Sequence, residues 1–271
     1  MGEADAPIGI FDSGVGGLTV ARAVMERLPN EAIVYFGDTA RVPYGVKSAA
    51  TIRRYATEIV RFLLAQQVKL LIVACNSMAA VALGEIAAAA RVVPVLDVID
   101  AGARAAAEVS RTRTVAVIGT AATVDSGAYA RQIHRYAADV RVLAKACPLL
   151  VPLVEEGWID HPVTAQVVSE YLAPFAAEPV DTLVLGCTHY PLLKPLLQRL
   201  VGAGVTLIDS AVTVAEQAAD TLSAMGLRRG GDLPPQHRFF VSDTPPRFHT
   251  LAERFLARSL PQVMLVPLDE H

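Results

Sequence analysis

The chain has 271 residues, of which 53% are hydrophobic and 6% aromatic, and a formal net charge of -3. This length suits two α/β lobes better than one ordinary domain. Lysine and arginine are scattered along the chain, which argues against a nucleic-acid partner. No apolar run reaches the roughly 18 residues that cross a bilayer, and the N-terminus lacks the basic and apolar regions of a signal peptide. We therefore expect a cytoplasmic protein without a membrane partner.

The first part of the chain alternates short apolar runs with amphipathic ones. We predict strands at 7–11, 32–36, 70–74 and 92–96, and helices at 18–28, 49–65 and 79–90. Strands that alternate with helices in this way predict right-handed βαβ units and a parallel sheet.

The alternation starts afresh after Asp100. We predict strands at 115–118, 140–143, 183–186, 205–208 and 238–241, and helices at 101–110, 165–175, 212–225 and 247–256. The last block is too short to form a core alone, so it should pack on the first lobe. The predicted fold is α/β, with two Rossmann-like lobes whose parallel sheets face each other across a cleft. The N-terminal lobe would span 1–97 and be completed by 209–271, and the second lobe would span 98–208.

Two predicted strands end in a cysteine that small polar residues follow: Cys75 with Asn76 and Ser77, and Cys187 with Thr188. Ligands bind at the carboxyl ends of strands in open α/β sheets. A single buried cysteine is most often just a small hydrophobic residue. Two at matching strand ends indicate a pair that faces across the cleft.

The third cysteine, Cys147, precedes a proline and has no matching partner, so we interpret it as structural. The three cysteines form no CxxC pair and are too few and too widely spaced for a disulfide framework or a zinc site. In a reducing compartment they stay free thiols. We expect no metal and no cofactor.

A thiol acts as a nucleophile or as an acid and base only when neighbouring groups lower its pKa. Asp12 and His189 are the candidates to tune Cys75 and Cys187. A lone catalytic cysteine would indicate acyl transfer, which also needs an oriented base and an oxyanion hole. Two thiols on opposite faces of a carbon could instead remove a proton and deliver one, which inverts a stereocentre. The pattern therefore indicates a racemase or an epimerase.

Two loops have alternative interpretations. The run from Asp12 to Gly17 is either a tight turn or a cradle of backbone N–H groups that binds an anion. It has neither a GxGxxG motif nor the lysine of a P-loop, so as a ligand group a carboxylate is favoured over a nucleotide. The loop 39–45 is a surface loop or a binding element. Thr120 and Thr123 suit the cap of a helix.

The longest motifs together resemble the glutamate racemase family over nearly the whole chain. The resemblance rests on the runs 8–20, 36–38, 43–45, 74–77, 147–157 and 186–192 and on the block 248–256. One departure is Ser77, where the family commonly has threonine. Serine keeps the hydroxyl and loses only a methyl group.

The resemblance implies a cofactor-independent interconversion of L- and D-glutamate by Cys75 and Cys187, with D-glutamate supplied to peptidoglycan in the cell wall. It implies that Asp12, Glu155 and His189 assist proton transfer. It also implies substrate contacts at Asp12, Ser13, Tyr44, Gly45, Asn76, Ser77, Thr120, Thr123, Thr188 and His189. The expected partner is the small-molecule substrate, and we expect a homodimer.

Two rival interpretations remain. An aspartate racemase would share the fold and both cysteines, but such relatives typically resemble Gly-Cys-Thr-Glu where this chain has His189. A binding or regulatory protein with an inactive site belongs to a different class. The intact pair of cysteines favours catalysis, and a turnover assay separates the two.

Overall fold

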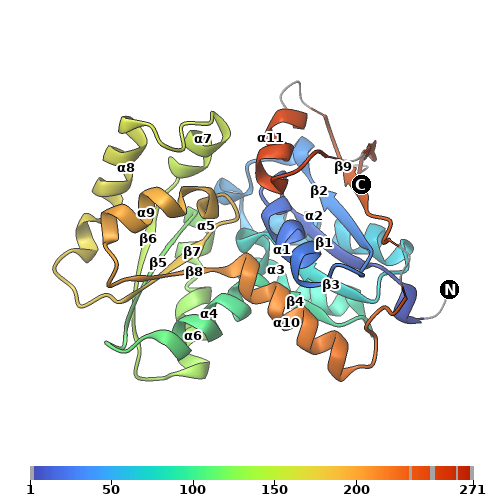
Figure 1. Ribbon diagram of the computed structural model, residues 1–271, viewed down its shortest axis with the longest axis horizontal. Helices are drawn as coiled ribbons and strands as arrows, with labels where there is room; N and C mark the ends of the chain where they lie inside the picture. Colours follow the sequence, from blue (N-terminus) through green and yellow to red (C-terminus); the bar gives the residue numbers. More distant parts are fainter. Residues whose placement is uncertain (1–2, 232–233, 245–247, 261, 269–271) are drawn as a thin grey trace.

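The computed structural model describes residues 3–231, 234–244, 248–260 and 262–268. It is an α/β structure with two parallel sheets, which lie side by side with helices packed around each (Figure 1). The first sheet has the strand order β10-β9-β2-β1-β3-β4, and the second has the order β6-β5-β7-β8. The predicted fold class is therefore confirmed.

The strands are short, and several are buried along their whole length, as expected for parallel sheets that are covered on both faces. The first sheet contains β1 (Ile8–Asp12), β2 (Ile33–Gly37), β3 (Leu70–Val73), β4 (Val95–Asp97), β9 (Arg238–Val241) and β10 (Val263–Leu265). The second contains β5 (Thr114–Gly119), β6 (Arg141–Ala146), β7 (Thr182–Gly186) and β8 (Thr206–Asp209).

The helices connect these strands. The α-helices are α1 (Leu18–Arg27), α2 (Ala49–Ala65), α3 (Asn76–Ala90), α4 (Val98–Val109), α5 (Ala121–Asp125), α6 (Ala128–Tyr136), α7 (Leu150–Glu155), α8 (Pro162–Leu172), α9 (Lys194–Val201), α10 (Ser210–Ala224) and α11 (Phe248–Leu256). The short 3₁₀ helices are η1 (Glu3–Asp5), η2 (Thr39–Arg41), η3 (Tyr44–Val46), η4 (Ala173–Phe175) and η5 (Tyr190–Leu193).

Both sheets contain the same arrangement of four strands, because β2-β1-β3-β4 corresponds to β6-β5-β7-β8. Right-handed crossovers then place the helix after the first strand on one face and the next two connections on the other. The packing agrees: α1 lies beside α10 and α2 beside α3, while α4 lies beside α6 and α8 beside α9. Ser77, two residues after Cys75, lies 3.0 Å through its Oγ from Oγ1 of Thr120, which directly follows β5, so the carboxyl ends of the two sheets meet here.

Two connections join the halves, and each begins with an aspartate that caps a helix. Asp97 Oδ1 accepts the N–H groups of Ile99 (2.8 Å) and Asp100 (3.0 Å) at the start of α4. Asp209 Oδ1 accepts the N–H of Ala211 (3.0 Å) at the start of α10. Since α4 and α10 pack on each other, the chain crosses twice through one junction.

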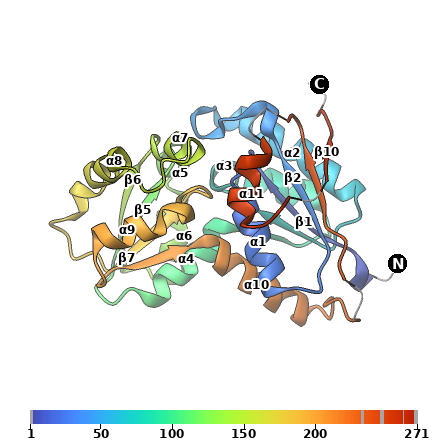
Figure 2. The same cartoon turned by 45° about the horizontal axis from the view of Figure 1, so that its top comes forward.

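The C-terminal block extends the first sheet. The sequence predicts this packing, because the block is too short to form a core of its own. Strand β9 pairs with β2, β10 pairs with β9, and α11 packs on α1. Figure 2 shows α11 beside α1 on the side of the molecule that faces the second half. The division of the chain into lobes of 1–97 with 209–271, and 98–208, stays a prediction.

Several element boundaries differ from the prediction. Helix α3 begins at Asn76, so Cys75 is its N-cap residue, and α4 begins at Val98 because Asp97 caps it. No range was predicted for helices α5, α6, α7 and α9 or for strand β10. Helix α6 starts after a left-handed glycine in a polar stretch, and β10 has three residues. Residues 1–2 of the N-terminal segment and Arg247, the predicted start of the last helix, lie outside the described residues. No helix within the described ranges is long and apolar enough to cross a membrane.

Candidate active site

Each half ends its third strand with a cysteine. Cys75 follows β3 and is the N-cap of α3, and Cys187 directly follows β7. Both side chains are buried, with 5% and 7% of each residue exposed, and both are free thiols. The two predicted thiols therefore occupy equivalent positions in sheets of the same strand order.

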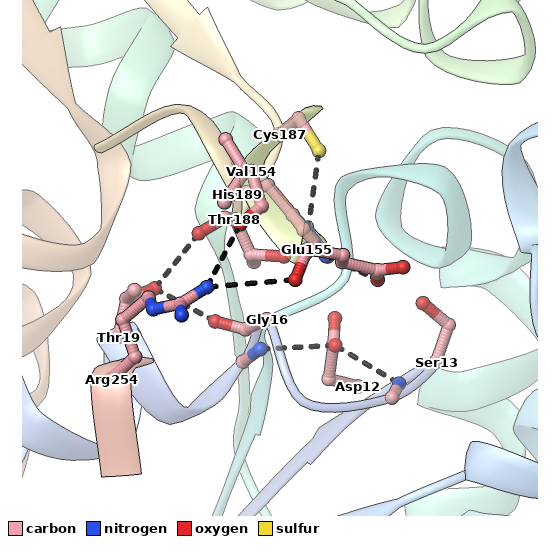
Figure 3. Close-up of polar contacts among 12 residues, drawn as sticks. Asp12, Ser13, Gly16, Thr19, Val154, Glu155, Cys187, Thr188, His189 and Arg254 are labelled. Atoms are coloured by element: carbon pink, nitrogen blue, oxygen red, sulfur yellow. Dashed lines mark hydrogen bonds and ion pairs between the residues drawn. The ribbon is translucent and has the colours of Figure 1, made fainter. Parts of the chain in front are cut away.

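The turn between β1 and α1 has its shape fixed by Asp12. Its Oδ2 accepts the N–H groups of Gly14 (3.0 Å) and Gly17 (2.9 Å), as Figure 3 shows. Its Oδ1 is buried and accepts no hydrogen bond within the described part of the chain. One carboxylate oxygen thus holds the turn, and the other remains available as an acceptor.

This turn contacts both segments that carry the cysteines. The Cys75 thiol donates to Ser13 Oγ at a distance of 3.6 Å. On the other side, a Cβ added to Gly16 would lie 2.3 Å from Thr188 Oγ1 and 2.7 Å from the ring of His189. Only glycine permits this approach. The sequence offered a tight turn or an anion cradle here, and the close contact with the second half supplies a further reason for the glycine.

The imidazole of His189 connects Cys187 to Glu155 (Figure 3). Its Nδ1 lies 3.9 Å from Cys187 Sγ, and its Nε2 lies 2.9 Å from Glu155 Oε1, at the end of α7. Burial alone lowers the pKa of His189, but the hydrogen bonds to Cys187 and Glu155 raise it to about 10. His189 is therefore an imidazolium at neutral pH, and both of its ring nitrogens donate.

Cys75 lies in the opposite electrostatic environment. Burial and the nearby carboxylate of Asp12 raise the pKa of its thiol to about 12, against the smaller effect of Ser13. Asp12, a candidate to tune this thiol, disfavours its ionisation, because an anion opposes a second negative charge beside it. Burial also raises the pKa of Asp12, which the turn amides and His189 partly offset. Cys75 is consequently a neutral thiol at neutral pH.

The loop 39–46 is held in place by specific contacts of its side chains and main chain. The hydroxyl of Tyr44 donates to Asp38 Oδ2, and the Tyr44 residue is only 2% exposed. A Cβ added to Gly45 would lie 2.8 Å from the Cβ of Thr120, in the second half. If Tyr44 contacts a ligand, its hydroxyl is already engaged, so the contact would come from its main chain.

The remaining predicted site residues form hydrogen bonds between the two halves. Ser77 Oγ lies 3.0 Å from Thr120 Oγ1, which lies 3.1 Å from Thr123 Oγ1. Thr120 also caps α5 by accepting the N–H of Thr123 (3.4 Å), as the capping interpretation predicts. Thr188 accepts, through its carbonyl oxygen, a hydrogen bond from Thr19 Oγ1 (3.3 Å).

Asn76 is held by a residue that the sequence did not single out. The hydroxyl of Tyr129 donates to Asn76 Oδ1 (2.8 Å) and lies 3.1 Å from Ser210 Oγ. A narrow cavity lined by Asn76, Cys187 and Ser210, among others, lies at this point between the halves. Nothing in the local sequence around Tyr129 distinguishes it from an ordinary helical core residue.

Cys147 lies apart from these contacts and fits its structural interpretation. Its thiol is buried and donates to the Lys145 carbonyl oxygen (3.5 Å), and its own carbonyl accepts the hydroxyl of Tyr190 (2.9 Å). Burial raises the pKa of this thiol to about 12.

Comparisons with known proteins identify the family of the chain. The family described as Asp/Glu/Hydantoin racemase matches residues 18–218. A protein named glutamate racemase from Syntrophus aciditrophicus (strain SB) is 60% identical, and the match covers 97% of each chain. One of the same name from Neisseria meningitidis serogroup A is 55% identical with the same coverage.

A solved structure extends the likeness to the whole fold. The crystal structure of glutamate racemase from Francisella tularensis in complex with D-glutamate has a TM-score of 0.93 and 39% identity, and the match covers 99% of this chain and 100% of that one. The chain therefore belongs to the glutamate racemases, amino-acid isomerases within the Asp/Glu/hydantoin racemase family.

Proposed function

We propose that the protein interconverts L- and D-glutamate by moving protons between the substrate Cα and the thiols of Cys75 and Cys187. The observation that carries the proposal is the equivalent placement of these cysteines after β3 and β7. The turn 12–17 links them, because Ser13 contacts Cys75 and Gly16 packs against the segment that follows Cys187. The relatives named above support glutamate as the substrate.

The two thiols have different surroundings. Burial and Asp12 keep Cys75 neutral, whereas Cys187 Sγ lies 3.9 Å from Nδ1 of the His189 imidazolium. In the direction from L-glutamate, Cys187 acts as the thiolate and takes the Cα proton, and the C–H electron pair stays on the substrate. The Cys75 S–H then delivers its proton to the opposite face, which yields D-glutamate. Cys75 is left as the thiolate and Cys187 as the thiol, the state from which D-glutamate reacts in reverse.

Asp12 suits the ammonium group of an amino acid. Its Oδ1 is a buried acceptor that lacks a partner among the described residues, and a buried acceptor of this kind favours a charged donor. We propose that Ser13, Tyr44, Gly45, Asn76, Ser77, Thr120, Thr123, Thr188 and His189 make the remaining substrate contacts. Asp12, Glu155 and His189 would assist proton transfer.

The biological setting is proposed from the family resemblance. D-glutamate made by this protein would supply peptidoglycan synthesis in the cytoplasm, and the protein would act as a homodimer. No cofactor takes part in the proposed reaction, since side chains of this chain accept the proton that leaves Cα and supply the proton that replaces it.

The test is chirality-resolved turnover by the pure protein with glutamate and, separately, aspartate, with no cofactor added. We expect either glutamate enantiomer to approach an equal mixture of the two, with little turnover of aspartate. Faster turnover of aspartate would favour the aspartate racemase alternative. Absence of turnover with both would favour a binding protein.

A further inference from the structure

The carboxylate of Asp38 is fully buried and lies where three segments of the first half meet. It accepts hydrogen bonds from Arg41 Nε (2.7 Å) and from the hydroxyl of Tyr44, both within the loop. Its other oxygen, Oδ1, accepts the hydroxyl of Ser242 (2.7 Å), which directly follows β9. A buried carboxylate needs such donors, because water cannot compensate its charge there.

Ser242 also holds the main chain of the loop. Its Oγ accepts the N–H of Ala40 (2.9 Å) while it donates to Asp38. Its neighbour Asp243 accepts the Thr39 hydroxyl through its carbonyl oxygen and donates its N–H to the same hydroxyl (2.9 Å). Hydrogen bonds therefore hold the start of the loop against the end of β9, about two hundred residues later in the chain.

The middle of the loop is fixed by Arg41. Its guanidinium pairs with Glu58 on α2 and lies 3.8 Å from the centre of the Tyr55 ring. Beyond it, Gly45 packs so closely against Thr120 that a Cβ would overlap with it. The loop thus spans from an anchor on the first sheet to a contact with the second half, next to Ser77 and Cys75.

We propose that Ser242 is a positioning residue of the active site: through Asp38 it fixes the loop 39–46 and thereby sets the affinity for the substrate, without taking part in proton transfer. The inference rests on the proposed function, which gives Tyr44 and Gly45 the role of substrate contacts. Loss of the Ser242 hydroxyl removes the donor to Asp38 Oδ1 and the acceptor for Ala40 N–H together. The loop then loses its register against Thr120, while both thiols keep their surroundings.

The test compares Ser242→Ala with Ser242→Thr and with Asp243→Ala. Ser242→Ala should raise the KM for L- and D-glutamate by about tenfold, the effect of one buried hydrogen bond to a charge, with kcat little changed. Ser242→Thr keeps the hydroxyl and should restore a KM near that of the unmodified protein. Asp243→Ala is the matched control, since its exposed side chain bonds, among the residues that the structure describes, only the Thr244 N–H (2.8 Å), and its KM should not change.

A double-mutant cycle separates positioning from general loss of stability. Tyr44→Phe removes another donor to Asp38, so its effect on KM should combine with that of Ser242→Ala less than additively. Additive effects, an unchanged KM in Ser242→Ala, or a fall in kcat alone would overturn the inference.

Calorimetric binding of glutamate to the same variants gives a readout that does not depend on turnover. If the unmodified protein binds glutamate without turning it over, and Ser242→Ala weakens this binding, the proposed function is refuted and this inference is supported. If the unmodified protein shows neither binding nor turnover, both are refuted.

Discussion

Cys75 and Cys187 each follow the third strand of a four-strand unit that occurs twice, β2-β1-β3-β4 and β6-β5-β7-β8. The repeat extends to the crossings, where Asp97 and Asp209 cap the helices that follow β4 and β8. Two similar units that face each other present similar groups from opposite sides. This arrangement suits inversion of a stereocentre by two bases, because the proton leaves one face and another arrives at the opposite face.

Replacement of either proposed catalytic cysteine by serine should abolish most racemisation. A hydroxyl is a far weaker acid and base than a thiol, and loss of one general acid or base typically costs ~10² to 10⁴ in rate. Because L- and D-glutamate have equal free energies in water, kcat/KM must fall by the same factor in both directions. Steady-state kinetics of Cys75→Ser and Cys187→Ser check this, with Cys147→Ser as the control. Damage from Cys147→Ser as large as from the other two would refute the assignment.

The two serine variants should differ in a partial reaction that needs only one deprotonation. With a glutamate analogue that carries a leaving group on nitrogen, the remaining thiolate removes the Cα proton and the leaving group departs. Cys75→Ser should therefore still eliminate from the L analogue, and Cys187→Ser from the D analogue. Product release from each enantiomer measures this. Equal elimination from both enantiomers by both variants would contradict the division of faces.

Alkylating agents should modify Cys187 before Cys75. The thiolate is the reactive form, and the pKa of Cys75 is raised to about 12 by burial and by Asp12, whereas Cys187 lies beside the imidazolium of His189. Peptide mass spectrometry after brief treatment at neutral pH would give the order, and bound glutamate should slow both reactions. Faster modification of Cys75 would contradict this order of reactivity, and no protection by glutamate would count against a substrate site at these cysteines.

Glu155→Gln should move the alkaline limit of activity to lower pH. The hydrogen bond and charge of Glu155 help to raise the pKa of His189 to about 10, so the imidazolium persists below that pH and is lost as the pH rises through it. Without the carboxylate the pKa falls toward its ordinary value, and the imidazolium is lost earlier. The pH profile of kcat/KM tests this, with the exposed Glu170→Gln as control. An alkaline limit that does not move would show that Glu155 has no such role.

Much of this site was predictable from local sequence. Apolar runs that end in Cys75 and Cys187 identify strand ends, and in a parallel sheet strand ends converge on ligands. Long-range contacts were not predictable, because Asp38 and Ser242 meet only through the pairing of β2 with β9, and Ser242 stands in no recognisable motif. The effect of Asp12 on Cys75 also required the structure, since it depends on the two groups lying close together in space. Helix α6 escaped prediction because it begins after a left-handed glycine in a mostly polar stretch that resembles a loop.

The central claim is that two bases act on opposite faces of Cα, and isotope exchange in heavy water tests it most directly. When L-glutamate is converted for a short time in deuterium oxide, the D-glutamate formed should carry deuterium at Cα, because its proton comes from a Cys75 thiol that has exchanged with solvent. Recovered L-glutamate should remain largely protiated. Deuterium that appears equally in substrate and product from the start would show that one base serves both faces and would contradict the account.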